Sequence, residues 1–117
     1  QYTAAALVSE NKILAHPASI DSISTSANQE DHVSMGSISA RKTLELVENV
    51  ENILAIELLT AAQAIDFRGP DKLGSKTKII HRMIRGVSPK ITSDRVFAAD
   101  IIKIKDIMTG KRFRKVI

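Results

Sequence analysis

One uninterrupted helical pattern runs from Asp31 to about Phe67 and ends where Gly69 and Pro70 follow. Aspartate is a favoured N-cap, so we expect Asp31 to begin this helix, and the Gly-Pro step stops it. A helix of about 36 residues would be about 54 Å long. This is far longer than an average globular helix, so the remaining elements must be arranged around it.

The two halves of this helix differ in their polarity. Apolar residues recur every three or four positions along the stripe Met35, Ile38, Leu44, Val47, Leu54, Leu58, Ala61 and Ile65. In the first half, charged and amide side chains mostly face away from the stripe, whereas residues 53–65 are apolar nearly all round. A helix of that second kind is typical of the middle of a bundle, where it has neighbours on several sides.

Shorter elements precede the long helix. Apolar residues over about 2–14 have helical spacing, and His16 before Pro17 ends that helix because a residue before proline avoids the α conformation. Residues 17–29 lack helical periodicity, so we expect a connecting loop, with Ile20 to Ile23 locally extended. A loop of this length in a compact protein is often functional.

After the Gly-Pro step the pattern predicts two short helices. Ser75 can cap a helix over about 76–86. Asp100 begins or caps a last helix over 101–109, which Gly110 closes at the C′ position. We expect residues 111–115 to fray.

The fold class that follows is all-α: one very long central helix, an N-terminal helix and two short C-terminal helices, forming part of a larger helical bundle. We divide the chain into a helix and active-site loop (1–31), the long core helix (32–68) and a basic helical tail (69–117). The short helices cannot cover the long one, so we expect either self-association through it or partners elsewhere in a longer polypeptide. The start at Gln1, directly before a helical pattern, also suggests a piece of a longer protein.

Composition excludes several classes of protein. The chain has no cysteine, which removes disulfide scaffolds, thiolate zinc sites and cysteine nucleophiles. No apolar run approaches the roughly 20 residues of a membrane span, and no basic segment of a signal peptide precedes the first helix. We therefore expect a cytoplasmic protein without a membrane partner.

Charge is distributed unequally along the chain. Residues 1–66 carry three basic and nine acidic side chains, a net charge of −6, whereas residues 67–117 carry fourteen and four, a net charge of +10. The simplest interpretation is that the two parts attract or solvate one another, and the alternative is a basic patch for nucleic acid. The aromatic content of 3% offers no stacking platform, so we consider nucleic acid an unlikely partner.

A concentration of polar side chains precedes the long helix, from Thr25 to Gly36. Glu30, Asp31 and His32 are adjacent, so they point about 100° apart on a helix and do not converge on a metal ion; we expect none. Asp31 has a structural task as the cap, whereas Glu30 is free to act as a general base or to bind a polar substrate group. Electrostatic stabilisation of the helix start is the competing explanation for Glu30.

The other histidines have simpler explanations. We expect His16 to be a packed ring and His81, between Ile80 and Arg82, to be a surface residue. Neither a Ser-His-Asp arrangement, a P-loop, a Gly-rich dinucleotide turn nor an HExxH motif is present, so those chemistries have no support here.

Three ordered blocks of sequence carry a resemblance to a known family. They are residues 4–19 (from AAALVSENK to AHPAS), residues 25–36 (TSANQEDHVSMG) and the segments LAIELL and AAQAIDFR with Asp94-Arg95. Together they resemble the C-terminal part of the histidine ammonia-lyases, a branch of the aromatic amino-acid ammonia-lyases and mutases. The match extends over essentially the whole chain.

The resemblance implies an elongated all-α homotetramer whose active sites are built from more than one chain, and which releases ammonia from L-histidine to give urocanate. It places Glu30 at the active-site glutamate, near the substrate imidazole, with Gln29 and Asn28 in the same wall as weaker candidates. Phenylalanine lyases tend to carry glutamine at that position, so Glu30 favours an imidazole-bearing substrate. His32 stays structural.

The chain departs from the family in one decisive respect. The family forms its methylidene-imidazolone prosthetic group from an Ala-Ser-Gly tripeptide, and these 117 residues contain none. We therefore expect the chain alone to be inactive. Two alternatives stay open: a phenylalanine or tyrosine lyase or aminomutase, and a non-enzymatic helical module with a basic nucleic-acid-binding tail.

Overall fold

The computed structural model describes residues 1–117 and confirms the all-α class. The chain divides into two units, Gln1–Val50 and Glu51–Ile117, and the long helix α2 (Gly36–Arg68) contributes residues to both. No helix is long and apolar enough to cross a membrane.

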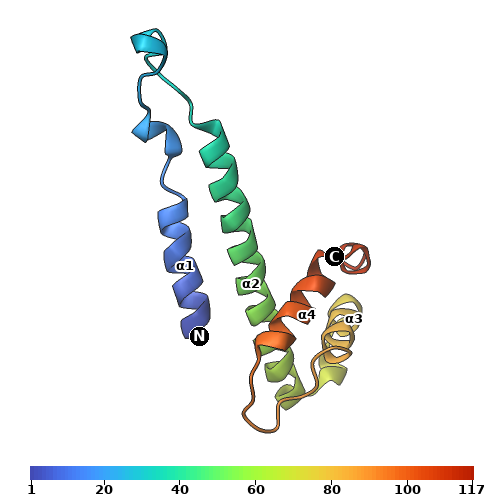
Figure 1. Ribbon diagram of the computed structural model, residues 1–117. Coiled ribbons are helices and arrows are strands. Elements are labelled where there is room, and N and C mark those ends of the chain that lie inside the picture. Colours follow the sequence, from blue (N-terminus) through green and yellow to red (C-terminus); the bar gives the residue numbers. More distant parts are fainter. The chain divides into compact units, whose positions relative to one another are not determined.

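The first unit pairs an N-terminal helix with the beginning of α2 (Figure 1). Helix α1 spans Tyr2–Leu14, as the periodicity predicts. The side-chain amide of Asn49 donates to Glu10 Oε2 at 2.7 Å and to Asn11 Oδ1 at 3.0 Å, and the Lys42 ammonium donates to the carbonyl of His16. Because α1 buries no residue fully, these polar contacts define the pairing more than apolar packing does.

Two short 3₁₀ turns, η1 (Ala18–Asp21) and η2 (Ser26–Asn28), occupy the connection between α1 and α2. The expected extension at Ile20–Ile23 is therefore only partial, since η1 includes its first two residues. His16 is not a packed ring: its side chain is 55% exposed, and its Nδ1 lies 4.0 Å from Asp21.

The start of α2 differs from the prediction. The helix begins at Gly36, so Asp31 is not its N-cap. Residues before it are held out of helical conformation, because Glu30 pairs with Thr25, the amide of Val33 donates to Ser22 Oγ at 2.7 Å, and Met35 adopts a φ of 52°. These interactions of the loop override the local capping preference of Asp31.

The second unit holds the hydrophobic core. Besides the rest of α2 it contains η3 (Pro70–Lys72), α3 (Ser75–Arg85), α4 (Ala98–Thr109) and α5 (Lys111–Arg114) (Figure 1). The core consists of buried side chains from α2, α3 and α4, namely Ala55, Leu59, Ala62, Ile84 and Ile104. The α2 members follow a spacing of four and three, and two of them are alanines, which lets the other helices pack close to the α2 backbone.

Four details of the C-terminal half differ from the predictions. Ser75 is the first residue of α3 and Gly74 occupies the cap, while α4 begins at Ala98 with Phe97 at its cap. Residues 111–115 do not fray: Lys111–Arg114 form α5, because Phe113 on it is buried. Gly110 ends α4 with a φ of −75°, so it does not close the helix in the left-handed conformation.

Candidate functional site

The candidate residues Asn28, Gln29 and Glu30 lie together in one tight loop of the first unit. An isolated antiparallel bridge closes the loop: the amide of Thr25 donates to the carbonyl of Glu30 at 3.1 Å, and the amide of Glu30 donates to the carbonyl of Thr25 at 3.3 Å. Inside it, the amide of Gln29 donates to the carbonyl of Ser26 at 3.2 Å. The backbone under all three candidate side chains is thus fixed by main-chain hydrogen bonds.

The turn inside this loop is left-handed. Ser26, Ala27 and Asn28 have φ values of 54°, 54° and 67°, and none of them is glycine. Such conformations cost of order 1 kcal/mol or more per residue and persist where the surrounding structure dictates them, often at functional sites. This strain is an observation additional to the sequence pattern, and it makes residues 25–30 a candidate functional loop.

The side chains of Asn28, Gln29 and Glu30 are all exposed. They present two amide groups and one carboxylate, which can accept and donate hydrogen bonds to a polar substrate or accept a proton. Asp31 and His32 are exposed as well. All five side chains therefore lie at the surface of this chain.

A second polar cluster lies in the second unit, and the sequence analysis missed it. Two side chains of α3 contact the carboxylate of Asp66 on α2. The Nε2 atom of His81 lies 2.8 Å from its Oδ1 atom, and the Nε atom of Arg85 lies 2.9 Å from its Oδ2 atom. All three side chains are at least 86% buried. His81 is therefore not a surface residue. The sequence feature that could have indicated its burial is Asp66, a carboxylate that directly follows the nearly apolar residues 53–65.

Gln63 extends this cluster by one helical turn. Its side-chain Oε1 accepts from the amide of Ile91 at 3.0 Å, and its Nε2 donates to the carbonyl of Ile91 at 3.0 Å. Arg85 Nη1 also donates to the carbonyl of Ser88 at 2.9 Å. These bonds hold the segment between α3 and α4 against α2.

Asp100, in the first turn of α4, is buried and ion-paired with Arg95. The Arg95 guanidinium lies 3.3 Å from both carboxylate oxygens. Burial alone would raise the pKa of the Asp100 carboxyl, but hydrogen bonds from Arg95 and Ser88 and the positive charges of Arg95 and Lys103 outweigh it, so the pKa lies below the ordinary value of 3.8. The carboxylate is therefore a charged structural group.

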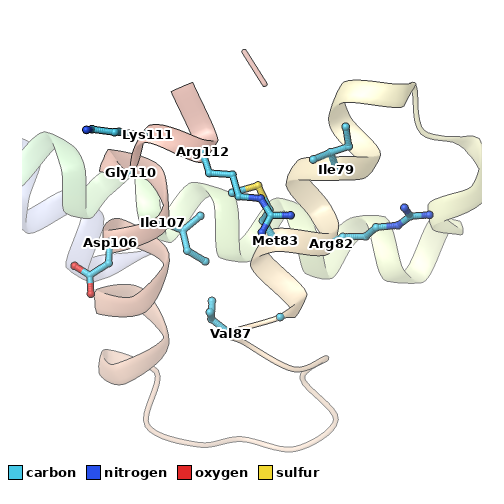
Figure 2. Close-up of a pocket in the computed structure, with 10 residues that line it drawn as sticks. Ile79, Arg82, Met83, Val87, Asp106, Ile107, Gly110, Lys111 and Arg112 are labelled. Carbon is cyan, nitrogen blue, oxygen red and sulfur yellow. The ribbon is translucent and has the colours of Figure 1, made fainter. Parts of the chain in front are cut away.

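A groove of about 620 Å³ lies between α3 and the α4–α5 pair (Figure 2). Ile79, Met83, Val87 and Ile107 form its apolar lining, and Figure 2 shows Arg112 reaching from α5 toward Met83. Of these four residues, Val87 also packs against the buried core.

Two of the three aromatic rings in residues 67–117 have a cation of the same chain over them. Lys90 lies over the Phe67 ring at 5.4 Å from its centroid, and Arg95 over the Phe97 ring at 5.3 Å. Two of the basic side chains that contribute to the +10 charge thus take part in intramolecular contacts.

Comparisons with known proteins define the class. A model of the aromatic amino acid lyase family matches residues 1–86, and the chain belongs to this family. It is 55% identical over 112 residues to histidine ammonia-lyase of Natranaerobius thermophilus, and the match covers 96% of this chain and 22% of that protein. This chain thus spans about a fifth of the length of the relatives that it matches.

Two solved structures of lyase and aminomutase enzymes are similar to this chain. The histidine ammonia-lyase of Trypanosoma cruzi superposes with a TM-score of 0.91 at 52% identity, over 97% of this chain and 23% of that one. The tyrosine aminomutase of Streptomyces globisporus gives the same TM-score at 38% identity, over 99% of this chain and 22% of that one. The backbone of this chain is therefore similar to the matching part of both enzymes.

Proposed function

We propose that this chain is the C-terminal part of a histidine ammonia-lyase, an enzyme that eliminates ammonia from L-histidine to give urocanate. The observation that carries the proposal is the identity of 52% to the histidine ammonia-lyase of Trypanosoma cruzi, against 38% to a tyrosine aminomutase with the same TM-score of 0.91. A tyrosine or phenylalanine enzyme, or an aminomutase, is the alternative within the family.

Glu30 is the residue that we assign to catalysis. Its carboxylate accepts a hydrogen bond or a proton from the substrate imidazole, a contact that a glutamine would make only in part. Gln29 and Asn28 bind the substrate from the same loop. The bridge between Thr25 and Glu30 and the left-handed turn support this role, because they fix the loop backbone while leaving the side chains exposed.

The electrophile must come from elsewhere in the parent protein. In the family a methylidene-imidazolone group would supply the electrophile for the elimination, and its Ala-Ser-Gly precursor does not occur in these 117 residues. The residues present here therefore cannot form this group, and we assign none of them to holding it. The 117-residue chain by itself is inactive in this proposal.

The parent is a cytoplasmic homotetramer that self-associates through the long helix. Large apolar side chains exposed on α2 support this association, with Leu44 71%, Val47 46% and Leu54 41% exposed. Light scattering on the 117-residue chain at micromolar concentration should detect oligomers. A stable monomer would count against the association.

A chimera tests the proposed activity. In it, this chain replaces the matching residues of the Natranaerobius thermophilus histidine ammonia-lyase, and urocanate formation is followed by its ultraviolet absorbance. We expect activity with L-histidine, and a loss of about 100-fold or more in kcat for Glu30→Gln. Asp31→Asn, a change of the neighbouring exposed carboxylate, is the matched control and should retain activity.

Two results would contradict the assignment. A preference of the chimera for L-tyrosine or L-phenylalanine would favour the alternative within the family. Equal effects of Glu30→Gln and Asp31→Asn would remove the specific role of Glu30. Urocanate produced by the 117-residue chain without the rest of the lyase would overturn the claim of inactivity.

A further inference from the structure

A cavity of about 360 Å³ lies where α3 meets the turn η3. Its lining is mostly cationic, with four basic side chains, one carboxylate and a proline: Lys78, His81, Arg82, Arg85, Asp71 and Pro70. Residues 78, 82 and 85 share one face of α3, because they are separated by four and three positions. The face thus gathers three permanent positive charges within two helical turns. We call it the Arg82 cavity.

The inner wall of the Arg82 cavity is held in place by buried contacts. His81 and Arg85 both contact Asp66, at 2.8 Å and 2.9 Å, and Arg85 also donates to the carbonyl of Ser88. Asp66 balances one positive charge of this wall and fixes the orientation of both side chains. A ligand that enters the cavity therefore meets a rigid wall.

The outer wall of the cavity has two cationic side chains that can contact a ligand. Arg82 is exposed and makes no ion pair or hydrogen bond through its side chain, and Figure 2 shows it extending away from Met83 and Ile107. Lys78 lies 3.6 Å from Asp71, whose side chain is 96% exposed. Such an exposed pair is weak, so Lys78 can exchange Asp71 for a stronger anionic partner.

We infer that the Arg82 cavity binds a compact oxyanion of the phosphate class, with Arg82 and Lys78 as its contacts and His81 and Arg85 as the fixed wall behind it. A guanidinium presents paired N–H donors that match two oxygens of a phosphate, and a lysine adds a point charge. None of Asn28, Gln29 and Glu30 takes part, so this site is additional to the proposed lyase function.

Isothermal titration calorimetry with inorganic phosphate tests the inference on the 117-residue chain. We expect one phosphate per chain with a Kd of about 1 mM or tighter, and binding about tenfold weaker or more for Arg82→Gln. Lys78→Gln should weaken binding in the same direction. Arg112→Gln is the matched control, because it removes one exposed arginine that does not line the Arg82 cavity, and it should bind phosphate as the unchanged chain does.

Circular dichroism should give the same helical signal for all variants, since all three side chains lie at the surface or half-buried. Sodium acetate and sodium chloride at matched ionic strength separate an oxyanion site from general charge attraction. Equal loss with Arg82→Gln and Arg112→Gln, equal heats with acetate and phosphate, or no phosphate binding would each overturn the inference.

Discussion

The Nε2 atom of His81 lies 2.8 Å from the Oδ1 atom of Asp66, and this contact joins the last turn of α2 to α3. The second carboxylate oxygen of Asp66 pairs with Arg85. One buried carboxylate thus serves two partners on the same neighbouring helix. Removing it would leave a buried guanidinium without its counter-ion, which is costly in a poorly solvated place.

The first prediction concerns this carboxylate. We expect Asp66→Asn to lower the free energy of unfolding by about 3 to 5 kcal/mol, because Arg85 keeps its charge and loses its partner. Urea denaturation followed by circular dichroism measures the change. Asp71→Asn is the control, since that carboxylate is 96% exposed and its pair with Lys78 should contribute little. Similar losses of unfolding free energy for the two variants would show that the buried cluster stabilises the fold no more than the exposed pair does.

The second prediction concerns the amide of Gln63. Gln63→Ala removes both hydrogen bonds to Ile91, and we expect the free energy of unfolding to fall by about 1 to 3 kcal/mol. The amide of Ile91 should also exchange with solvent faster, as measured by hydrogen exchange. Gln29→Ala changes the exposed glutamine of the loop and should alter neither quantity. Unchanged exchange at Ile91 would contradict the proposed attachment of the segment.

The third prediction concerns pH. The pKa of Asp100 is lower in the folded chain than its ordinary value of 3.8, so its ionised form favours the folded state. This contribution is complete above the unfolded pKa and is lost as the pH falls through the folded pKa. Asp100→Asn should therefore reduce the dependence of stability on pH below about pH 4.

Unfolding curves between neutral pH and strongly acidic pH measure this effect. Asp106→Asn, on the same helix but exposed, controls for the removal of one negative charge. Arg95→Gln should lower stability at neutral pH, because it leaves the buried carboxylate with fewer donors. A pH dependence that is unchanged by Asp100→Asn would refute the linkage.

The fourth prediction concerns the apolar core. Ile104 on α4 is fully buried, and we expect Ile104→Ala to lower the free energy of unfolding by about 2 to 5 kcal/mol, from lost burial and the cavity left behind. Ile102→Ala on the same helix is the control, because that side chain is 57% exposed. The midpoint of thermal unfolding should fall more for Ile104→Ala than for Ile102→Ala. A larger fall for Ile102→Ala would contradict the assigned core.

Periodicity and helix-breaking residues predicted much of this fold. The bounds of α1 and the end of α2 before Gly69 follow from local rules, because apolar spacing and proline act within a few residues. The start of α2 was predicted wrongly at Asp31. Its capping preference is overridden by the pairing of Thr25 with Glu30, a contact that no local pattern reveals.

The polar clusters also depend in part on tertiary contacts that local sequence patterns do not predict. The sequence singled out Asn28, Gln29 and Glu30 through a dense polar run and a family resemblance, and they do share one loop. The sequence predicted His81 at the surface because its neighbours Ile80 and Arg82 do not indicate a contact with Asp66. That carboxylate lies fifteen positions away on another helix. Burial of Phe113, which orders α5, likewise depends on tertiary contacts and not on local propensity.

The contact between Gln63 and Ile91 uses only main-chain atoms of position 91. The Gln63 side chain on α2 therefore holds the segment between α3 and α4 through a contact that other side chains at position 91 would permit, while the Ile91 side chain itself packs against the core. Proline is the exception, because it has no N–H to donate. A library of substitutions at position 91 should accordingly retain other large apolar residues, which keep both the main-chain contact and the packing against the core, and should exclude proline.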